Sequence, residues 1–307
     1  MHSEYELVRI DDGQYEQFAS LVEASFGAKS AIRDVERLFA TEAFGTKHIG
    51  FMAYQAGEAA AFYGVFPCRV ELDGVTHLAA QSGSTMTHPD HRKKGLFVAT
   101  GQRTFELARA EGIRFVFGFP RDTSYPGLMK LGWSSNGRFN VYDFFIPTLP
   151  LAAVSATSSR CIKAFAPYKV EPYRPPRNSV IEPGVGGVKR DDDLIAYKGE
   201  TASRFVIEVE GARVWIAMRR GVLGIGDIAP VDSSEQVKAV IKKLKAICFR
   251  AGIVRMVTYL SPECRLDRVL REAGYNARTG LPICHLDLGS GLPLDNFKYV
   301  YGDFDTF

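Results

Sequence analysis

The chain has 307 residues, of which 46% are hydrophobic and 24% are charged, and its formal net charge is +3. This length predicts two domains of ordinary size, and the composition is typical of a soluble globular protein. The small net charge argues against nucleic acid or a membrane surface as a partner. No apolar run approaches the length of a membrane span, and the first ten residues lack the pattern of a signal peptide. We therefore expect a cytoplasmic protein without membrane insertion.

The five cysteines are odd in number and scattered, with no C-x-x-C pair and no cluster with histidine. A disulfide framework and a structural zinc site both need such groupings. The sequence therefore predicts reduced cysteines and no bound metal.

The first half of the chain shows the hydrophobic periods of alternating strands and helices. In order, the expected segments are a strand at 5–10, helices at 15–26 and 31–40, strands at 48–55, 59–72 and 75–87, a helix at 96–110, and strands at 113–119 and 141–146. Asp73-Gly74 separates two of these strands and is a strong signal for a tight hairpin. The order predicts an α+β fold with a mixed sheet.

A basic turn, His-Arg-Lys-Lys-Gly at residues 91–95, lies between the strand at 75–87 and the helix that follows. The first N–H groups of a helix have no intrahelical partners, and the aligned peptide dipoles leave that end partly positive. Gly95 lets the backbone approach an anion closely, and the preceding cations add charge. A pyrophosphate suits this arrangement better than a single carboxylate. The alternative is a solvated basic turn ahead of an ordinary helix.

Residues 92–97, Arg-Lys-Lys-Gly-Leu-Phe, resemble the acyl-CoA pyrophosphate loop of the GNAT acetyltransferase superfamily, (Q/R)-x-x-G-x-(G/A), and depart from it at Phe97. The segment from Arg121 to Trp133 is similar to the family's N-x-x-A-x-x-x-Y-x-x-x-G-F, with Arg121 in place of the Asn and Leu128 in place of the Tyr. Strand, loop, helix, strand and second motif follow one another in the family's order. That combination is more specific than the loop alone.

The second half of the chain looks like a degenerate repeat of the first. Proline and glycine are frequent at 148–190, which predicts a crossover segment holding a helix at 152–165. The repeat then consists of strands at 202–209, 213–219 and 222–228, a helix at 234–252, a strand at 253–260 and a helix at 262–273. We therefore expect two tandem GNAT-like domains, each a mixed, mainly antiparallel sheet flanked by helices. Domain 1–147 would hold the acyl-CoA site, and domain 191–307 would shape the acceptor site, because Pro230-Val231-Asp232 replaces the basic turn there.

The resemblance implies direct transfer of an acyl group from CoA to an amine, with acetyl-CoA or another acyl-CoA as co-substrate. The residues that it implies for binding acyl-CoA are Thr85, Met86, Thr87, Arg92, Lys93, Lys94, Gly95, Leu96 and Phe97. A fixed donor must stabilise the oxyanion that develops on the thioester, commonly a backbone N–H near residues 85–87. No cysteine needs to act as a nucleophile.

The groups that move protons are less sharply indicated, because Leu128 cannot replace the family's tyrosine as a general acid. Tyr125 lies one helical turn earlier, Asp122 follows the strand at 113–119, and His88 ends the strand at 75–87. Each has a structural alternative: a packing aromatic for Tyr125, a helix cap for Asp122 and a turn residue for His88.

The residues expected to contact the acceptor are Gln81, Arg121, Trp133, Asp303 and Asp305. Gln81 is otherwise a polar residue on the open side of the sheet. The C-terminal residues 299–307 alternate aromatic and acidic types. They are expected either to bring a carboxylate to the acceptor or to form a closing edge strand with its acidic side in water.

Chains with this tandem arrangement resemble GNAT enzymes that acylate amino sugars carried on nucleotides, as in surface polysaccharide synthesis. A nucleotide-linked amino deoxy sugar is therefore the favoured acceptor, and an aminoglycoside, a polyamine or a protein N-terminus is the alternative. Tandem GNAT folds also resemble aminoacyl-tRNA-dependent peptidoglycan ligases, but the small net charge argues against tRNA. A CoA-binding regulator without catalysis is the non-enzyme alternative. The partner is expected to be a small-molecule amine, and the protein a monomer or homodimer.

Overall fold

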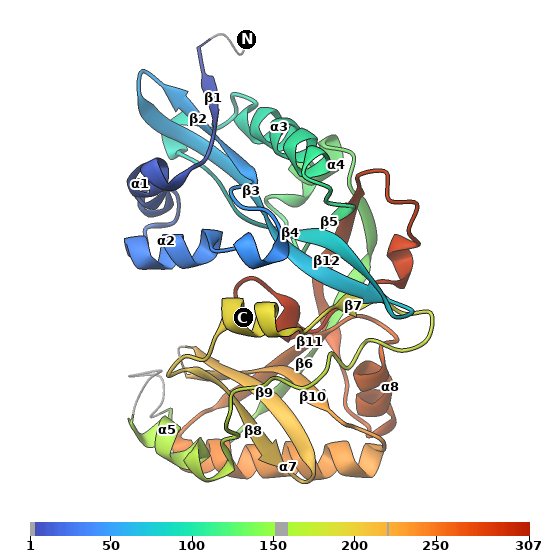
Figure 1. Ribbon diagram of the computed structural model, residues 1–307. Coiled ribbons are helices and arrows are strands. Elements are labelled where there is room, and N and C mark those ends of the chain that lie inside the picture. The colour runs from blue at the N-terminus through green and yellow to red at the C-terminus, as the bar shows by residue number, and fades with distance from the viewer. Residues whose placement is uncertain (1–3, 151–158, 220) are drawn as a thin grey trace. The chain divides into compact units, whose positions relative to one another are not determined.

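The computed structural model describes residues 4–150, 159–219 and 221–307 (Figure 1). The chain forms two compact units. Unit 1 consists of Met1–Val70, Thr76–Asn136 and Pro282–Leu294, and unit 2 consists of Glu71–Val75, Gly137–Leu281 and Asp295–Phe307. The units therefore differ from the contiguous divisions expected at 1–147, 148–190 and 191–307, because the boundary falls after Asn136 and a late segment returns to unit 1.

Unit 1 is built on a mixed, mainly antiparallel sheet with the strand order β1-β2-β3-β4-β5-β12. The strands are β1 (Glu6–Arg9), β2 (Gly50–Gln55), β3 (Glu58–Leu72), β4 (Val75–Thr87), β5 (Phe115–Gly118) and β12 (Arg278–Asp287). The pairings β1–β2, β2–β3 and β5–β12 are antiparallel, whereas β4 and β5 run parallel. Asp73 and Gly74 join β3 to β4 with φ values of +50° and +78°, which confirms the hairpin signal.

Helices cover both faces of this sheet (Figure 1). They are α1 (Tyr15–Phe26), α2 (Ile32–Phe39), α3 (Leu96–Ala110) and α4 (Tyr125–Lys130). Successive strand residues point to opposite faces, so Phe62 and Phe66 of β3 pack in the core with α1 and α2, while Tyr63 and Val65 pack in the core with α3 and α4. Burial of both faces explains why β3 is almost continuously apolar.

Unit 2 repeats the order of meander, long helix, parallel strand and short helix. Its sheet has the order β6-β11-β10-β9-β8, with β10 and β11 parallel and the pairs β6–β11, β9–β10 and β8–β9 antiparallel. Its elements are β6 (Ser134–Phe145), α5 (Ser159–Phe165), β7 (Gly187–Val188), α6 (Asp192–Lys198), β8 (Arg204–Val209), β9 (Ala212–Arg219), β10 (Val222–Ala229), α7 (Ser234–Ala251), β11 (Arg255–Leu260) and α8 (Arg265–Glu272). The apolar residues of α7 that recur every three or four positions enter the core.

The expected sixth strand of the first domain is wrong in its placement. The strand at 141–146 coincides with the last five residues of β6, which pairs with β11 inside unit 2, with Asn140 opposite Leu260 and Phe145 opposite Arg255. The strand next to β5 in unit 1 is β12, with Cys284 opposite Gly118. Pairing between segments so distant in the chain leaves no local pattern in the sequence.

The expected edge strand at the C-terminus is also wrong. Residues 301–303 form a 3-10 turn, η7 (Tyr301–Asp303), and Asp303 is buried rather than in water.

The expected helix at 152–165 is described from Ser159 onward, and residues 152–158 lie outside the described residues. Among the described residues, no helix combines the length and the apolar character that crossing a membrane requires.

Candidate active site

The candidate site lies where the parallel strands β4 and β5 stop pairing. Ala80 is opposite Val116 and Gln81 is opposite Phe117, and β5 ends one residue later, whereas β4 continues to Thr87. Ser84 has a φ of +52°, a left-handed conformation that a strand residue other than glycine rarely adopts. The last residues of β4 therefore extend past the end of β5, and their backbone is bent.

The direction of the backbone groups at the end of β4 follows from one hydrogen bond. The N–H of His88 donates to the carbonyl of Ala60 on β3 at 2.8 Å. Because backbone groups of consecutive strand residues point to alternate sides, the N–H of Thr87 points away from β3. Nε of Arg92 donates to the carbonyl of Thr87 at 3.4 Å, so a cation lies on that same side. Among residues 85–87, where the oxyanion donor is expected, the N–H of Thr87 therefore points away from β3 and toward the side on which Arg92 lies.

The basic turn forms a loop of left-handed residues at the start of α3. Lys93 has a φ of +63° and Gly95 a φ of +79°, and Gly95 is the N-cap residue of α3. The first bonds of the helix run from the N–H groups of Val98 and Ala99 to the carbonyl of Gly95, both at 3.1 Å. The N–H groups between Lys94 and Phe97 lie ahead of that ladder, and Arg92, Lys93 and Lys94 are exposed beside them. Glycine at 95 is needed because its backbone conformation strains other residues.

The loop is held to β1 by a contact that the sequence did not suggest. The Tyr5 hydroxyl lies 2.9 Å from Nδ1 of His91, and Nζ of Lys94 lies 5.8 Å from the centre of the Tyr5 ring. Burial, together with the neighbouring Lys94 cation, lowers the pKa of His91. A neutral His91 bonded to Tyr5 fixes the turn without adding repulsion to the loop's cations.

The departure from the family motif at Phe97 is matched by a glycine on α4. A Cβ atom placed on Gly127 would lie 2.6 Å from the Phe97 ring, and Phe97 makes an edge contact with Tyr63, with the ring centres 5.3 Å apart. Leu128, which replaces the family's tyrosine, is buried in the core cluster that contains Tyr63. Phe97 is accommodated because residue 127 has no side chain.

The three candidate proton carriers have different environments. Nδ1 of His88 accepts from the N–H of Asp90 at 3.3 Å, which is the turn contact that its structural alternative requires. Asp122 is exposed in the turn after β5, and the N-cap position of α4 belongs to Ser124 rather than to Asp122. Tyr125 begins α4 and is half-buried against the core that contains Leu128.

The candidate acceptor residues of unit 1 are not all accessible. Gln81 is buried, with 7% of its surface exposed, in the last paired position of β4, while Arg121 is exposed. Trp133 is buried against Phe105, with the ring centres 5.9 Å apart, and its indole N–H has no hydrogen-bond partner. Of these three side chains, Arg121 is the one that solvent reaches freely.

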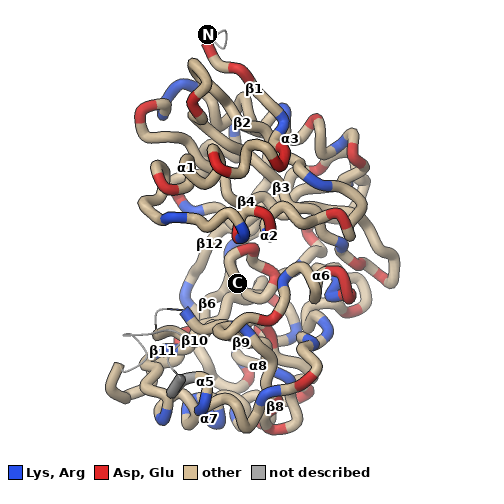
Figure 2. Tube along the Cα trace, turned by 60° about the vertical axis from the view of Figure 1, so that its left-hand side comes forward, with Lys and Arg blue, Asp and Glu red and all other residues tan. Residues whose placement is uncertain are grey.

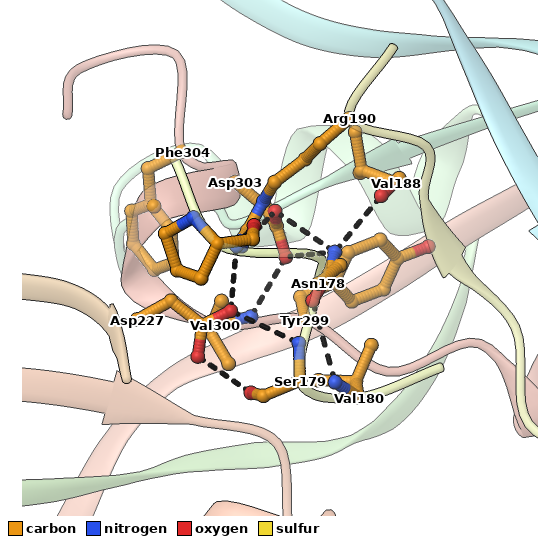
Figure 3. Close-up of polar contacts among 12 residues, drawn as sticks. Asn178, Ser179, Val180, Val188, Arg190, Asp227, Tyr299, Val300, Asp303 and Phe304 are labelled. Atoms are coloured by element: carbon orange, nitrogen blue, oxygen red, sulfur yellow. Dashed lines mark hydrogen bonds and ion pairs between the residues drawn. The ribbon is translucent and has the colours of Figure 1, made fainter. Parts of the chain in front are cut away.

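Asp303 and Asp305 belong to unit 2, where their surroundings differ. Asp303 is buried in a polar cluster, and its carboxylate accepts from Arg190, Asn178 and the N–H of Val300 (Figure 3). Burial raises the pKa of Asp303, and the Arg190 cation opposes that shift. The Asp305 residue is exposed at the surface of the same unit.

Ser82 and Tyr63 were not singled out in the sequence. The Ser82 hydroxyl donates to the Tyr63 hydroxyl at 3.1 Å, and burial raises the pKa of Tyr63. Tyr63 contacts Phe97 of the loop, so the hydroxyl lies under the first turn of α3. The one signal in the sequence for this contact is the register of the hairpin that joins β3 to β4.

The residues present fit an acyl-CoA. Exposed cations beside N–H groups that precede a helix match a pyrophosphate, and the part of β4 beyond β5 offers backbone groups to the thioester. In the part of the chain that the structure describes, no group of three His, Cys, Asp or Glu residues is placed to hold a metal ion.

Residues 6–135 match the family model of the acetyltransferase (GNAT) domain. This range contains the loop, β4, β5 and α4. The chain therefore carries a GNAT acetyltransferase domain, and the protein is an acyl-CoA-dependent N-acyltransferase that uses acetyl-CoA or another acyl-CoA as co-substrate.

Several solved structures have a similar fold. A GCN5-related N-acetyltransferase from Kribbella flavida aligns over 93% of this chain and 71% of its own, with a TM-score of 0.60 and 16% identity. A probable N-acyltransferase from Enterococcus faecalis aligns over 93% and 73%, with a TM-score of 0.61 and 14% identity. A putative acetyltransferase from Pyrococcus horikoshii aligns over 98% and 94%, with a TM-score of 0.54 and 14% identity. At these identities the likeness shows the fold alone. No curated protein matches the sequence.

Proposed function

We propose that this acyltransferase modifies the amino group of a deoxy sugar carried on a nucleotide. The observation that carries the proposal is an exposed cation, Arg121, in the turn after β5. Arg92, Lys93 and Lys94 belong to the loop that binds the pyrophosphate of acyl-CoA, so Arg121 is the cation of residues 81–97 and 115–125 that remains for the acceptor. A phosphorylated acceptor is attracted by a cation, whereas a polycationic acceptor such as an aminoglycoside or a polyamine is repelled by it.

In this proposal the loop and β4 position the reacting groups. The N–H groups ahead of α3, with Arg92 and Lys94, bind the pyrophosphate, and the N–H of Thr87 donates to the thioester oxygen as it becomes negative. Holding the thioester beside the amine removes most of the entropic cost of a bimolecular encounter. Arg121 contributes a cation for the acceptor's phosphate or carboxylate.

Proton transfer is assigned to side chains near the end of β5. Asp122 accepts the proton of the attacking ammonium, and Tyr125 protonates the leaving thiolate in place of the residue at 128. His88, whose Nδ1 faces Asp90, is the second candidate base. Tyr125→Phe is expected to lower kcat about tenfold while the KM for acyl-CoA changes less than twofold. An unchanged kcat would remove Tyr125 from the mechanism.

The test of the acceptor is a thiol-release assay with acetyl-CoA and a panel of amines: nucleotide-linked 3- and 4-amino sugars, the same amino sugars without the nucleotide, aminoglycosides, polyamines and peptides. Release of CoA with the nucleotide-linked sugars and not with the free amino sugars supports the proposal, because it shows that the nucleotide is recognised. Faster release with an aminoglycoside, a polyamine or a peptide overturns it in favour of that acceptor.

A further inference from the structure

Unit 2 contains a groove with a volume of about 540 Å³ that we call the arginine groove. Its walls are the segment 174–181, the end of β10 with residues 230–231, and the first turn of α8. Four arginines line it: Arg174, Arg177, Arg213 and Arg265. No Asp or Glu is among the described residues that line it, so its own walls carry only positive charge. Figure 2 shows Lys and Arg positions around the labels α6 and α8 of this unit.

The arginines of the groove are held only by exposed ion pairs. Arg265 lies 2.7 Å from Asp232, Arg174 lies 3.0 Å from Asp192, and between 51% and 87% of the surface of these four side chains is exposed. Arg177 pairs with Glu71 at 3.3 Å and Arg213 with Glu208 at 3.7 Å. The Glu71 side chain is 18% exposed, whereas the other three are between 43% and 77% exposed. Exposed pairs of this kind contribute only about 0–1 kcal/mol each. An incoming phosphate can therefore take over these guanidinium groups at little cost.

Apart from Asn178 and Ser179, the rest of the groove lining is apolar. Its remaining members include the aliphatic and proline side chains Pro175, Pro176, Ile181, Ile228, Ala229, Pro230, Val231 and Leu266. A groove that joins an apolar lining to several arginines suits a ligand with a flat apolar body and a strongly anionic end. A bare inorganic anion would leave the apolar lining unused.

The segment 174–181, which forms one wall of the groove, is held in place by a buried polar cluster (Figure 3). The N–H and hydroxyl of Ser179 both donate to Asp227, and the amide of Asn178 donates to Asp303 and to the carbonyl of Val188. Arg190 joins the two carboxylates, at 2.6 Å from Asp227 and 3.2 Å from Asp303, and also donates to the carbonyl of Pro176 at 3.0 Å. The side chains of Arg190, Asp227 and Asp303 are at most 2% exposed. The groove is therefore preformed, which lowers the entropic cost of binding.

A second hollow of about 280 Å³ lies on the other side of the same segment. It shares Arg174 and Arg177 with the groove, and its other charged members are Lys189, Arg190, Glu71 and Asp192. Because two carboxylates lie there and Arg190 is buried between Asp227 and Asp303, the surplus of positive charge belongs to the groove and not to this second hollow.

We propose that the arginine groove binds a nucleoside diphosphate, with the arginines on the phosphates and the base against the apolar lining. Arginine matches this ligand because its planar guanidinium donates two parallel hydrogen bonds to a phosphate. The inference rests on the proposed function in one respect, because a nucleotide-linked acceptor would carry a nucleoside diphosphate. Binding to the groove does not require turnover.

The test is isothermal titration calorimetry of the full chain with uridine diphosphate, inorganic pyrophosphate and uridine, each with coenzyme A at saturation so that the loop at 92–97 is occupied. The groove variant is Arg177→Gln/Arg265→Gln. The control is Arg103→Gln/Arg278→Gln, which removes two cations that are equally exposed and do not line the groove. Both variants change surface residues, and their melting temperatures establish that the fold persists.

The expected result is that uridine diphosphate binds the wild type and the control with the same Kd, that the groove variant binds it at least about tenfold more weakly, and that uridine alone does not bind. An unchanged Kd in the groove variant overturns the proposal. So does pyrophosphate binding as tightly as uridine diphosphate, because the apolar lining would then contribute nothing. If uridine diphosphate binds through the groove but nucleotide-linked sugars are not acylated, this inference stands and the proposed function fails. If those sugars are acylated but uridine diphosphate does not bind through the groove, the proposed function stands and this inference fails.

Discussion

The same scaffold occurs twice in this chain, and the two copies differ at the place where the parallel strands part. In unit 1, β4 runs past the end of β5, bends at Ser84 and presents the N–H of Thr87 beside a cationic loop. In unit 2, β10 pairs with β11 from Val222 to Gly224, and its register with β9 on the other side shifts between Ile225 and Asp227. In both units the two parallel strands therefore stop pairing at corresponding positions.

The opening in unit 2 is filled by the protein's own C-terminus. Val300 forms a bridge with Leu260 at the end of β11, and the rings of Tyr301 and Phe307 lie where a side chain on Gly224 or Gly226 would be. The start of the following helix is occupied as well, because the Ser233 hydroxyl accepts from the N–H of Gln236. A capped helix and a filled opening leave no place for a pyrophosphate or a thioester. The comparison shows that the fold creates the opening and that local residues decide whether a ligand or the chain itself fills it.

The largest expected effect is on the buried cluster under the C-terminus. Asp303→Asn leaves Arg190 short of a charged partner in a buried site, so the free energy of unfolding should fall by about 3 kcal/mol. Urea denaturation measures it, and Asp305→Asn, at an exposed position, is the matched control with an expected change below about 0.5 kcal/mol. Equal stability of the two variants, with activity lost in Asp303→Asn, would instead favour a direct role for Asp303 in binding the acceptor.

The next effect is on acyl-CoA binding. Gly95→Val forces a β-branched residue into a left-handed conformation at the helix start, and the affinity for acetyl-CoA should fall about 100-fold. Gly57→Val carries a comparable backbone strain, at φ +84° and in open space, and should bind normally. Calorimetry is expected to give one site per wild-type chain. A residual site in Gly95→Val would show that unit 2 also binds acyl-CoA, and the comparison would fail.

A smaller effect is expected from the loop's first cation. Arg92→Ala should weaken acetyl-CoA binding about tenfold and leave the melting temperature unchanged, because Arg92 is exposed and makes one backbone contact. Arg103→Ala on the exposed side of α3 is the control. An unchanged dissociation constant for Arg92→Ala would mean that the loop does not bind the pyrophosphate.

A separate effect concerns the pH dependence of stability in unit 2. Lys198 is buried and donates to the carbonyls of Gly302 and Phe304, and burial lowers its pKa from 10.5 to about 7. Between these values the unfolded chain binds a proton that the folded chain does not, so this residue makes stability rise with pH by about 1.4 kcal/mol per pH unit. Below pH 7 the contribution is constant.

The measurement is the difference in unfolding free energy between the wild type and Lys198→Met from pH 6 to pH 9.5. It should be flat at the acidic end and then rise in favour of the wild type. Lys238→Met, on the exposed side of α7, should show no such slope. A flat difference over the whole range would mean that Lys198 keeps its proton.

Local signals predicted most of the fold and the loop. Asp73-Gly74 fixed a hairpin, the apolar period fixed α3 and α7, and Gly95 placed the helix start, because each of these is decided by residues close together in the chain. The positive φ of Ser84 had no signal, since serine is not a residue type that marks a left-handed position.

Contacts between distant residues could not be predicted in the same way. The exchange that places β12 next to β5 and β6 next to β11 depends on sheet pairing, and the strands themselves read as ordinary apolar runs. The burial of Asp303 was missed because its partner Arg190 lies 113 positions earlier. The bond between Tyr5 and His91 was missed for the same reason.

The position of β12 has a consequence for how this protein is made. The strand that covers the edge of β5 belongs to residues 278–287, which leave the ribosome more than 140 positions after residue 135. Until then the nascent catalytic unit has an unpaired, apolar strand edge, which is a template for aggregation. A shortened gene that ends after the sequence motif at residue 135 would encode every loop residue of the acyl-CoA site and still expose that edge. The sheet of the catalytic unit is therefore complete only when synthesis has passed residue 287.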